Sequence, residues 1–146
     1  MPAFVGSRAF TLLASAARST AVALADGAQT PALAERWGAG GCLFTLDVTE
    51  AGSAAGDTLD VVIQGQFGNG SWIDIVYFTQ VLGNGGAKQE CVKVLAAGSQ
   101  AAFQGGTALT AGNSRNILSD LLRVKYGLVN GGGTHAFTFG VYGYPL

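Results

Sequence analysis

The residues of this chain that could take part in catalysis are few, and its single histidine is the first to consider. His135 follows three glycines and shares a predicted strand face with Phe137 and Phe139. A Ser-His-Asp triad places an imidazole between a hydroxyl and a carboxylate, and the Gly-x-Ser-x-Gly turn that presents such a serine does not occur in the sequence. We therefore interpret His135 as a surface or packed residue at a strand end, and we assign no catalytic residue.

Paired carboxylates are the other route to acid-base chemistry, and the chain has nine acidic residues. Asp57 and Asp60 flank the start of a predicted strand, while Asp47 and Asp74 fall within strands on faces predicted to be exposed. Because the spacing indicates no substrate cleft, we interpret all four as solvated strand-face residues. No metal or cofactor is predicted: one His and two Cys supply few metal ligands. The glycine clusters precede strands, whereas a phosphate loop leads into a helix.

The densest basic group consists of Arg115, Arg123 and Lys125. Arg123 and Lys125 share one strand face, but Tyr126 points to the other face. A groove for single-stranded nucleic acid needs cations and aromatic rings together on one face. The net charge of −1 also provides no broad basic surface. We therefore expect no nucleic-acid partner, and we interpret Arg123 and Lys125 as two strand-surface cations that pair with Asp47, Asp60 or Asp74 across strands.

The cysteines and the N-terminal region give information on the cellular compartment in which the protein is found. Cys42 and Cys91 form no Cys-x-x-Cys pair, and we favour two buried, reduced thiols, with a single disulfide as the alternative. Residues 9–25 resemble a signal peptide only weakly, because Arg18 interrupts the apolar stretch. We interpret this region as part of the mature structure. No apolar stretch is long enough to predict a membrane span.

The length and charge content indicate one domain, residues 1–146, with a weakly charged surface. Charged residues make up 12% of the chain, about half the usual share of about 25%. Soluble monomers normally keep more charges of both signs on their surface. We therefore expect a homo-oligomer or a component of a larger assembly.

The elements that would position these residues are strands, because hydrophobic residues alternate with a period of two between glycine-rich turns. We predict one helical turn at most, over Pro31–Trp37, and a long Ala/Gly-rich loop over 96–113. The predicted fold is all-β: a single antiparallel β-sandwich, or a jelly-roll-like barrel, of about seven strands. The predicted strands are 10–16, 42–49, 58–67, 71–82, 88–95, 116–129 and 135–144.

Several segments in a fixed order carry a resemblance to a known group of proteins. They are Ala14-Ser15-Ala16-Ala17-Arg18, Leu46-Asp47-Val48-Thr49, Thr58-Leu59-Asp60-Val61-Val62-Ile63-Gln64 with Trp72-Ile73-Asp74, and Leu122-Arg123-Val124-Lys125-Tyr126 with Gly132-Gly133-Thr134 and Phe137-Thr138-Phe139. In this order and spacing, over most of residues 8–141, the chain resembles small virion proteins of tailed bacteriophages, most closely the decoration or cement proteins of the head. The chain departs from that pattern at 19–41, which contains Trp37, and at 96–113.

The resemblance implies a structural protein without catalysis, small-molecule substrate or membrane partner. Its partner would be the major capsid protein, on the virion surface after assembly in the host cytoplasm, and it would form a homo-oligomer such as a trimer. Residues 1–8 could act as an N-terminal arm that adds a strand to a neighbour. Aromatic residues in irregular segments are the candidate interface anchors: Phe4, Trp37 and Phe103. The alternative functions are a head-tail connector, or a tail-associated adhesion or carbohydrate-binding module with Trp72 and Tyr142 on a strand face.

Overall fold

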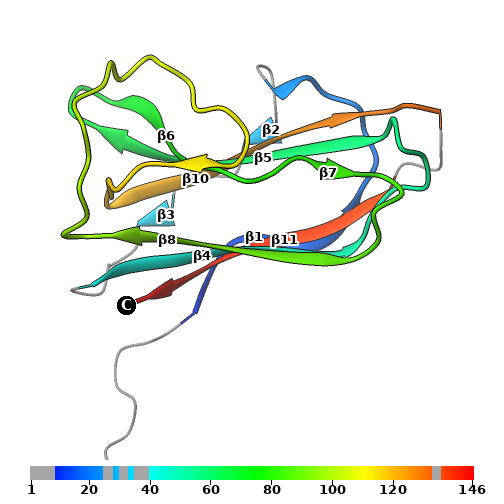
Figure 1. Ribbon diagram of the computed structural model, residues 1–146, viewed down its shortest axis with the longest axis horizontal. Helices are drawn as coiled ribbons and strands as arrows, with labels where there is room; N and C mark the ends of the chain where they lie inside the picture. Colours follow the sequence, from blue (N-terminus) through cyan, green and yellow to red (C-terminus); the bar gives the residue numbers. More distant parts are fainter. Residues whose placement is uncertain (1–8, 25–27, 30–32, 35–39, 133–135) are drawn as a thin grey trace, which may run out of the picture.

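The computed structural model describes residues 9–24, 28–29, 33–34, 40–132 and 136–146. Within these residues the chain forms eleven strands and no α-helix (Figure 1). The strands are β1 (Phe10–Arg18), β2 (Ala28–Gln29), β3 (Leu33–Ala34), β4 (Gly41–Glu50), β5 (Thr58–Phe67), β6 (Ser71–Tyr77), β7 (Val81–Leu82), β8 (Lys88–Leu95), β9 (Asn113–Ser114), β10 (Leu121–Val129) and β11 (Phe137–Pro145).

The strands form two antiparallel sheets that face each other in two layers (Figure 1). One sheet has four strands in the order β1-β11-β4-β8. The other has seven strands in the order β2-β10-β5-β6-β9, with β3 also paired to β10 and β7 to β5. The described strands do not close into a barrel, so the barrel alternative is wrong.

The hydrophobic core lies between the sheets and follows the alternation in the sequence. A buried aliphatic or aromatic side chain contributes about 1.5–3 kcal/mol relative to exposure, so these alternating rows are the main force that holds the layers together. The rows contributed by β4, β5 and β11 are Cys42, Phe44, Leu46 and Val48, then Leu59, Val61 and Ile63, then Phe137, Phe139 and Val141.

A β-bulge interrupts the pairing of β5 with β6. Ile63 lies opposite Val76, but the next residue, Gln64, lies opposite Asp74. Ile75 is therefore an extra residue on β6, and both Ile75 and Val76 are buried. A bulge of this kind changes which face the following side chains occupy.

Because of the bulge, the residues of β6 do not occupy the faces that the sequence pattern predicts. Strict alternation places Trp72 with Val76 and Phe78 on one face and Tyr77 on the other. In the structure Val76 and Phe78 are buried in the core, whereas Trp72, Asp74 and Tyr77 line one pocket on the outer face of the seven-stranded sheet. The prediction was wrong here because a sequence pattern with period two contains no signal for the inserted residue.

The predicted strand over 71–82 is divided in the structure. β6 ends at Tyr77 and β7 begins at Val81. Between them, the backbone N–H of Thr79 donates to the carboxylate of Glu90 on β8, at 2.9 Å from Oε2. This bond crosses from one sheet to the other, so it takes Thr79 out of strand pairing.

The predicted strand over 116–129 begins later, at Leu121. Asn116 instead fastens the preceding loop, because its Nδ2 donates to the carbonyl of Ser99 at 3.1 Å and its Oδ1 accepts from the N–H of Leu95 at 3.1 Å. Asparagine commonly makes such side-chain bonds to the backbone in place of strand pairing.

Two other predictions concern the N-terminal third. The helical turn over Pro31–Trp37 is wrong at Leu33 and Ala34, which form β3, and the rest of that turn lies outside the described residues. The proposed arm, residues 1–8, lies outside them as well. Among the described residues, seven strands have seven or more residues, and each overlaps a predicted strand.

Candidate functional site

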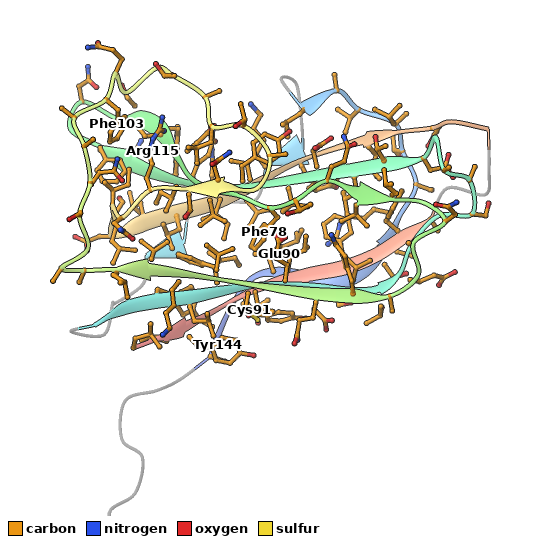
Figure 2. The ribbon with its side chains drawn as sticks, viewed as in Figure 1. Phe78, Glu90, Cys91, Phe103, Arg115 and Tyr144 are labelled. Carbon is orange, nitrogen blue, oxygen red and sulfur yellow. The ribbon has the colours of Figure 1, made fainter. Side chains whose placement is uncertain are left out.

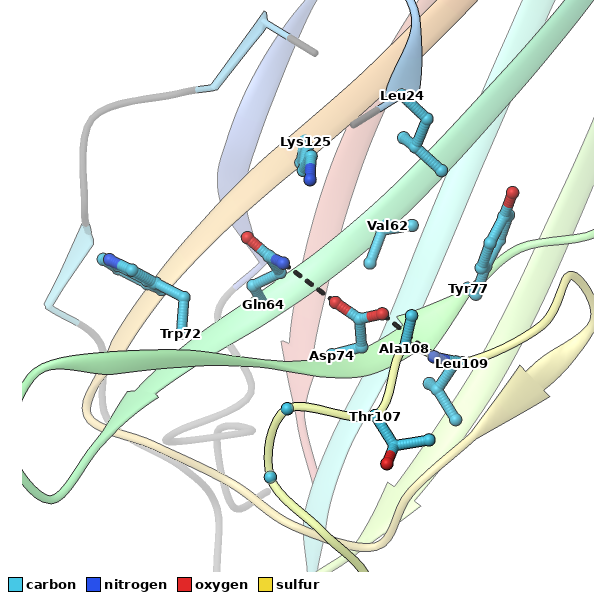
Figure 3. Close-up of a pocket in the computed structure, with 12 residues that line it drawn as sticks. Leu24, Val62, Gln64, Trp72, Asp74, Tyr77, Thr107, Ala108, Leu109 and Lys125 are labelled. Atoms are coloured by element: carbon cyan, nitrogen blue, oxygen red, sulfur yellow. Dashed lines mark hydrogen bonds between the residues drawn. The ribbon is translucent and has the colours of Figure 1, made fainter. Parts of the chain in front are cut away.

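A pocket of about 400 Å³ lies on the outer face of the seven-stranded sheet, between the strands and the loop over 105–109 (Figure 3). Val62 and Gln64 of β5 lie at its base and are buried. Asp74 and Tyr77 of β6 and Lys125 of β10 surround them. The base of the pocket therefore consists of paired strands, and the loop forms its rim.

A hydrogen-bonded relay fixes the polar side chains of this pocket. Arg123 Nε donates to Gln64 Oε1 at 2.8 Å, and Gln64 Nε2 donates to Asp74 Oδ1 at 2.8 Å. The second oxygen of Asp74 accepts from the backbone N–H of Leu109 at 3.0 Å. Burial lowers the pKa of Arg123 from its ordinary value. The relay holds the amide and the carboxylate in one orientation and ties the rim loop to the sheet.

Trp72 extends the pocket into a second hollow. The guanidinium carbon of Arg123 lies 4.1 Å from the centroid of the Trp72 ring, which fixes the ring by a cation–π contact. The second hollow has a volume of about 560 Å³ and shares Trp72, Gly105 and Gly106 with the first. The two hollows together form an elongated site with an aromatic ring at its middle.

The other end of the pocket is formed by Tyr77. Its hydroxyl donates to Asp60 Oδ1 at 3.0 Å, and Gln80 Nε2 donates to Asp60 Oδ2 at 3.0 Å. Burial, and then the hydrogen bond to the Asp60 carboxylate, raise the pKa of Tyr77 to about 12. Tyr77 is therefore a neutral hydroxyl at physiological pH.

The loop over 96–112 that forms the rim is fastened by Arg115. This side chain is buried, and its guanidinium donates to the carbonyls of Asp74 at 3.0 Å and Thr107 at 2.7 Å. It also lies 4.1 Å from the centroid of the Phe103 ring (Figure 2). Arg115 therefore joins the rim loop to the edge of β6.

Phe103, which contacts Arg115, is one of the three predicted interface anchors. Phe103 is 36% exposed and packs on Arg115 with one face. Phe4 and Trp37 lie outside the described residues. A role in contacts between chains stays a prediction for all three.

The interpretation of the acidic residues as solvated is wrong for Asp57. Its side chain is buried, Oδ1 accepts from the N–H of Gly131 at 2.7 Å, and Oδ2 accepts from the N–H of Ala54 at 3.2 Å. Asp57 therefore joins two turns at one end of the molecule. Asp60 and Asp74 belong to the pocket region described above, and His135 lies outside the described residues.

The two cysteines differ in environment. Cys42 is buried, as predicted, and burial raises the pKa of its thiol to about 12. Cys91 is exposed, contrary to the prediction, and both thiols are free. Cys42 points into the core from β4, whereas Cys91 of β8 lies opposite Thr45 on the outer face of the four-stranded sheet (Figure 2).

That outer face also carries an apolar patch, which we call the C-terminal patch: Leu43, Leu95, Tyr144 and Leu146. Leu43 lies opposite Tyr144, and Gly41, one step along the same face, lies opposite Leu95 and bonds to the N–H of Leu146 at 3.0 Å. The exposed fractions are 42% for Leu95, 40% for Tyr144 and 42% for Leu146. Leu43 is half-buried, and the exposed Lys93 lies opposite it on β8. Exposed apolar groups that gather on one sheet face are typical of interaction surfaces.

Sequence reasoning singled out Trp72 and Asp74 but did not bring them together with Gln64, Lys125 and Tyr77. One signal was available: Gln64 comes directly after the apolar run Val61-Val62-Ile63. A polar residue at such a position usually has fixed hydrogen-bond partners. The bulge that brings Tyr77 to the same face had no comparable signal.

Comparisons with known proteins leave the family open: no family model, curated protein or solved structure matches the chain. In the described part of the chain, no group of three or more His, Cys, Asp or Glu residues is placed to hold a metal ion. The same residues include no helix with the length and apolar character needed to cross a membrane. The features that bear on function are therefore the outer faces of the two sheets and the resemblance in the sequence.

Proposed function

We propose that this chain is a β-sandwich structural protein of a tailed-bacteriophage particle, a decoration protein that binds the major capsid protein and stabilises the head. The observation that carries this proposal is the C-terminal patch. It presents three exposed apolar side chains, Leu95, Tyr144 and Leu146, beside the half-buried Leu43 on the outer face of a hydrogen-bonded sheet. A sheet face of this kind suits a contact with a second protein surface, because little conformational entropy is lost when it docks.

The mechanism of such a protein is mass action and requires no catalytic residue. A protein that binds only the mature capsid lattice stabilises that lattice by its binding free energy at each site. Repetition over many capsomers would multiply a modest contact into substantial stabilisation of the shell. We expect the chain to act as a homo-oligomer, with a trimer at the local threefold positions of the capsid.

Quantitative mass spectrometry of purified particles tests this proposal. We expect a copy number equal to that of the major capsid protein, or a simple fraction of it. A few copies per particle would overturn the proposal in favour of a neck or tail component. Absence of the chain from washed particles would overturn its assignment to the virion.

A further inference from the structure

The elongated site around Trp72 has the composition of a binding site for a polar, uncharged ligand. Its two hollows, of about 400 and 560 Å³, fall within the range of about 300–1,000 Å³ for ligand pockets. The relay from Arg123 through Gln64 to Asp74 fixes its polar groups in place. Pre-oriented polar groups give specificity at a low entropic cost.

The polar groups retain capacity for further hydrogen bonds. A carboxylate can accept about four hydrogen bonds and an amide N–H₂ can donate two. Asp74 accepts one on each oxygen from Gln64 and Leu109. The side chain of Lys125 points into the pocket, and its ammonium group forms no hydrogen bond or ion pair with another described residue (Figure 3). The site therefore offers donors and acceptors side by side, which matches groups that both donate and accept, namely hydroxyls.

The charges favour a neutral ligand over other classes. Asp74 and Lys125 line the pocket, and the Arg123 guanidinium lies beside it against Trp72 and Gln64. A phosphate or sulfate would meet the Asp74 carboxylate, and a cation would meet Lys125 and Arg123. A wholly apolar ligand would bury these charged groups without compensation, which is costly. A neutral ligand with many hydroxyls avoids all three penalties.

Trp72 and the glycines of the rim determine the shape of the site. The indole ring lines both hollows, and its face opposite the Arg123 guanidinium is the apolar surface that the C–H face of a sugar ring would use. Gly106 also lines both hollows, and a Cβ placed there would meet no atom within 4 Å. The rim at Gly106 therefore leaves space for a ligand, and the shared residues place the two hollows next to each other.

We propose that this site binds a neutral oligosaccharide, with one sugar ring stacked on Trp72 and its hydroxyls bound by Gln64, Asp74 and Lys125. This inference goes beyond the capsid proposal and does not depend on it, because the site and the C-terminal patch lie on different sheets. Binding here would attach a particle, or the free protein, to a glycan-bearing surface.

The test is an NMR titration of the full chain with short neutral oligosaccharides of the glucose, galactose and N-acetylglucosamine series. We expect at least one series to shift the amide signals of Gly105, Gly106 and Leu109 at up to about 10 mM, which detects millimolar dissociation constants. No shift with any series would overturn the proposal. Larger shifts of the same signals with inorganic phosphate or sulfate would overturn the neutral ligand.

Variants localise the site. Trp72→Ala should weaken binding at least tenfold by removing the stacking surface. Gly106→Leu places a side chain in open space at the entrance and should also weaken binding at least tenfold, with unchanged thermal unfolding. Tyr144→Ser, on the other sheet, is the matched control and should bind as the wild type does. Wild-type affinity in both site variants would show that the sugar binds elsewhere and would overturn the proposal.

Discussion

The outer face of the four-stranded sheet presents Leu43, Leu95, Tyr144 and Leu146 on a regular strand surface, whereas that of the seven-stranded sheet presents hydrogen-bonded polar groups beneath a loop. The first face carries exposed apolar side chains and suits a broad contact with another protein. The second is hollowed and suits a small polar ligand. The same antiparallel scaffold therefore supports two different kinds of recognition.

The difference has a structural origin in the connections. On the four-stranded sheet, β4 pairs without interruption with β8, while register shifts interrupt the pairing of β11 with β1 and β4. Its outer face has no covering loop among the described residues. On the seven-stranded sheet, the bulge at Ile75 turns Trp72, Asp74 and Tyr77 outward together. The long loop over 96–112 then returns across β6, where Arg115 and Asp74 fasten it. In this molecule the pocket is therefore built from a bulge together with a covering loop.

We expect the largest effect on the free energy of unfolding at Asp57, which joins two turns at one end of the molecule. Asp57→Ala removes the acceptors of the Gly131 and Ala54 N–H groups. Hydrogen bonds to charged groups contribute about 1.5–3 kcal/mol each, so we expect a loss of about 3–4 kcal/mol in the free energy of unfolding, measured by urea denaturation. Asp120→Ala, at an exposed position, is the control and should change stability by less than about 0.5 kcal/mol. A similar small loss in both variants would show that Asp57 does not hold these turns.

The second prediction separates the two faces by their contact with the capsid. The double variant Tyr144→Ser with Leu146→Ser removes half of the C-terminal patch. Central apolar interface residues contribute about 2 kcal/mol each, so occupancy on purified particles should fall at least tenfold at subsaturating concentration. Thermal unfolding should change little, because both side chains are exposed.

The seven-stranded sheet provides a matched control for this variant. Leu82 and Val129 lie on either side of Thr58 and are 48% and 52% exposed. Replacing both with Ser removes the same kind of surface from the other sheet, and occupancy on particles should stay at the wild-type level. Equal losses in the two double variants would mean that general hydrophobicity, rather than the patch, drives attachment.

The sequence predicts the core-facing residues of the strands better than it predicts what the outer faces of the two sheets present. The alternation of Cys42, Phe44, Leu46 and Val48 is enough to place the core face of β4, because a two-residue period has only one buried side. By the same rule, Leu43 must point outward. The composition of the C-terminal patch was therefore open to prediction, but its exposure depends on how the C-terminal strand aligns beside β4, which no local pattern specifies.

The pocket was beyond the reach of such reasoning. Asp74 lies opposite Gln64 only because one residue of β6 bulges, and Leu109 reaches Asp74 only because the loop returns over that strand. Both features belong to the tertiary structure and have no periodic signal in the sequence. The misassignment of Asp57 has a related cause: Ala54 is close in the chain, but the partner with the shorter hydrogen bond, the backbone N–H of Gly131, lies in a turn remote from Asp57.

The third prediction concerns pH and the polar face. Tyr77 has a folded-state pKa of about 12 against an ordinary value of 10.0. A raised pKa means that the folded state favours the protonated phenol. The stabilisation is therefore complete below pH 10 and is lost as the pH rises to about 12. In Tyr77→Phe the decline in stability over this window should be shallower than in the wild type, measured by urea denaturation at a series of pH values.

Cys42 must be held constant in that experiment, because burial raises the pKa of its thiol to about 12 and it titrates in the same window. The comparison is therefore made between wild type and Tyr77→Phe, both of which retain Cys42. Parallel stability curves for the two proteins would contradict the raised pKa of Tyr77, which burial and then the hydrogen bond to Asp60 produce.

The smallest effect is expected at the two cysteines, which report on the inner and outer faces of the four-stranded sheet. Only a thiolate reacts readily with disulfide reagents, and Cys42 is both buried and held protonated by its raised pKa. Cys91 is exposed. One thiol should therefore react with Ellman's reagent in the folded protein and a second only in denaturant. Cys91→Ser should abolish the first reaction and change stability by less than about 0.5 kcal/mol, as is usual for surface positions. Rapid labelling of Cys42 in the folded Cys91→Ser variant would show that the sheets separate readily. The two outer faces would then not belong to one rigid scaffold.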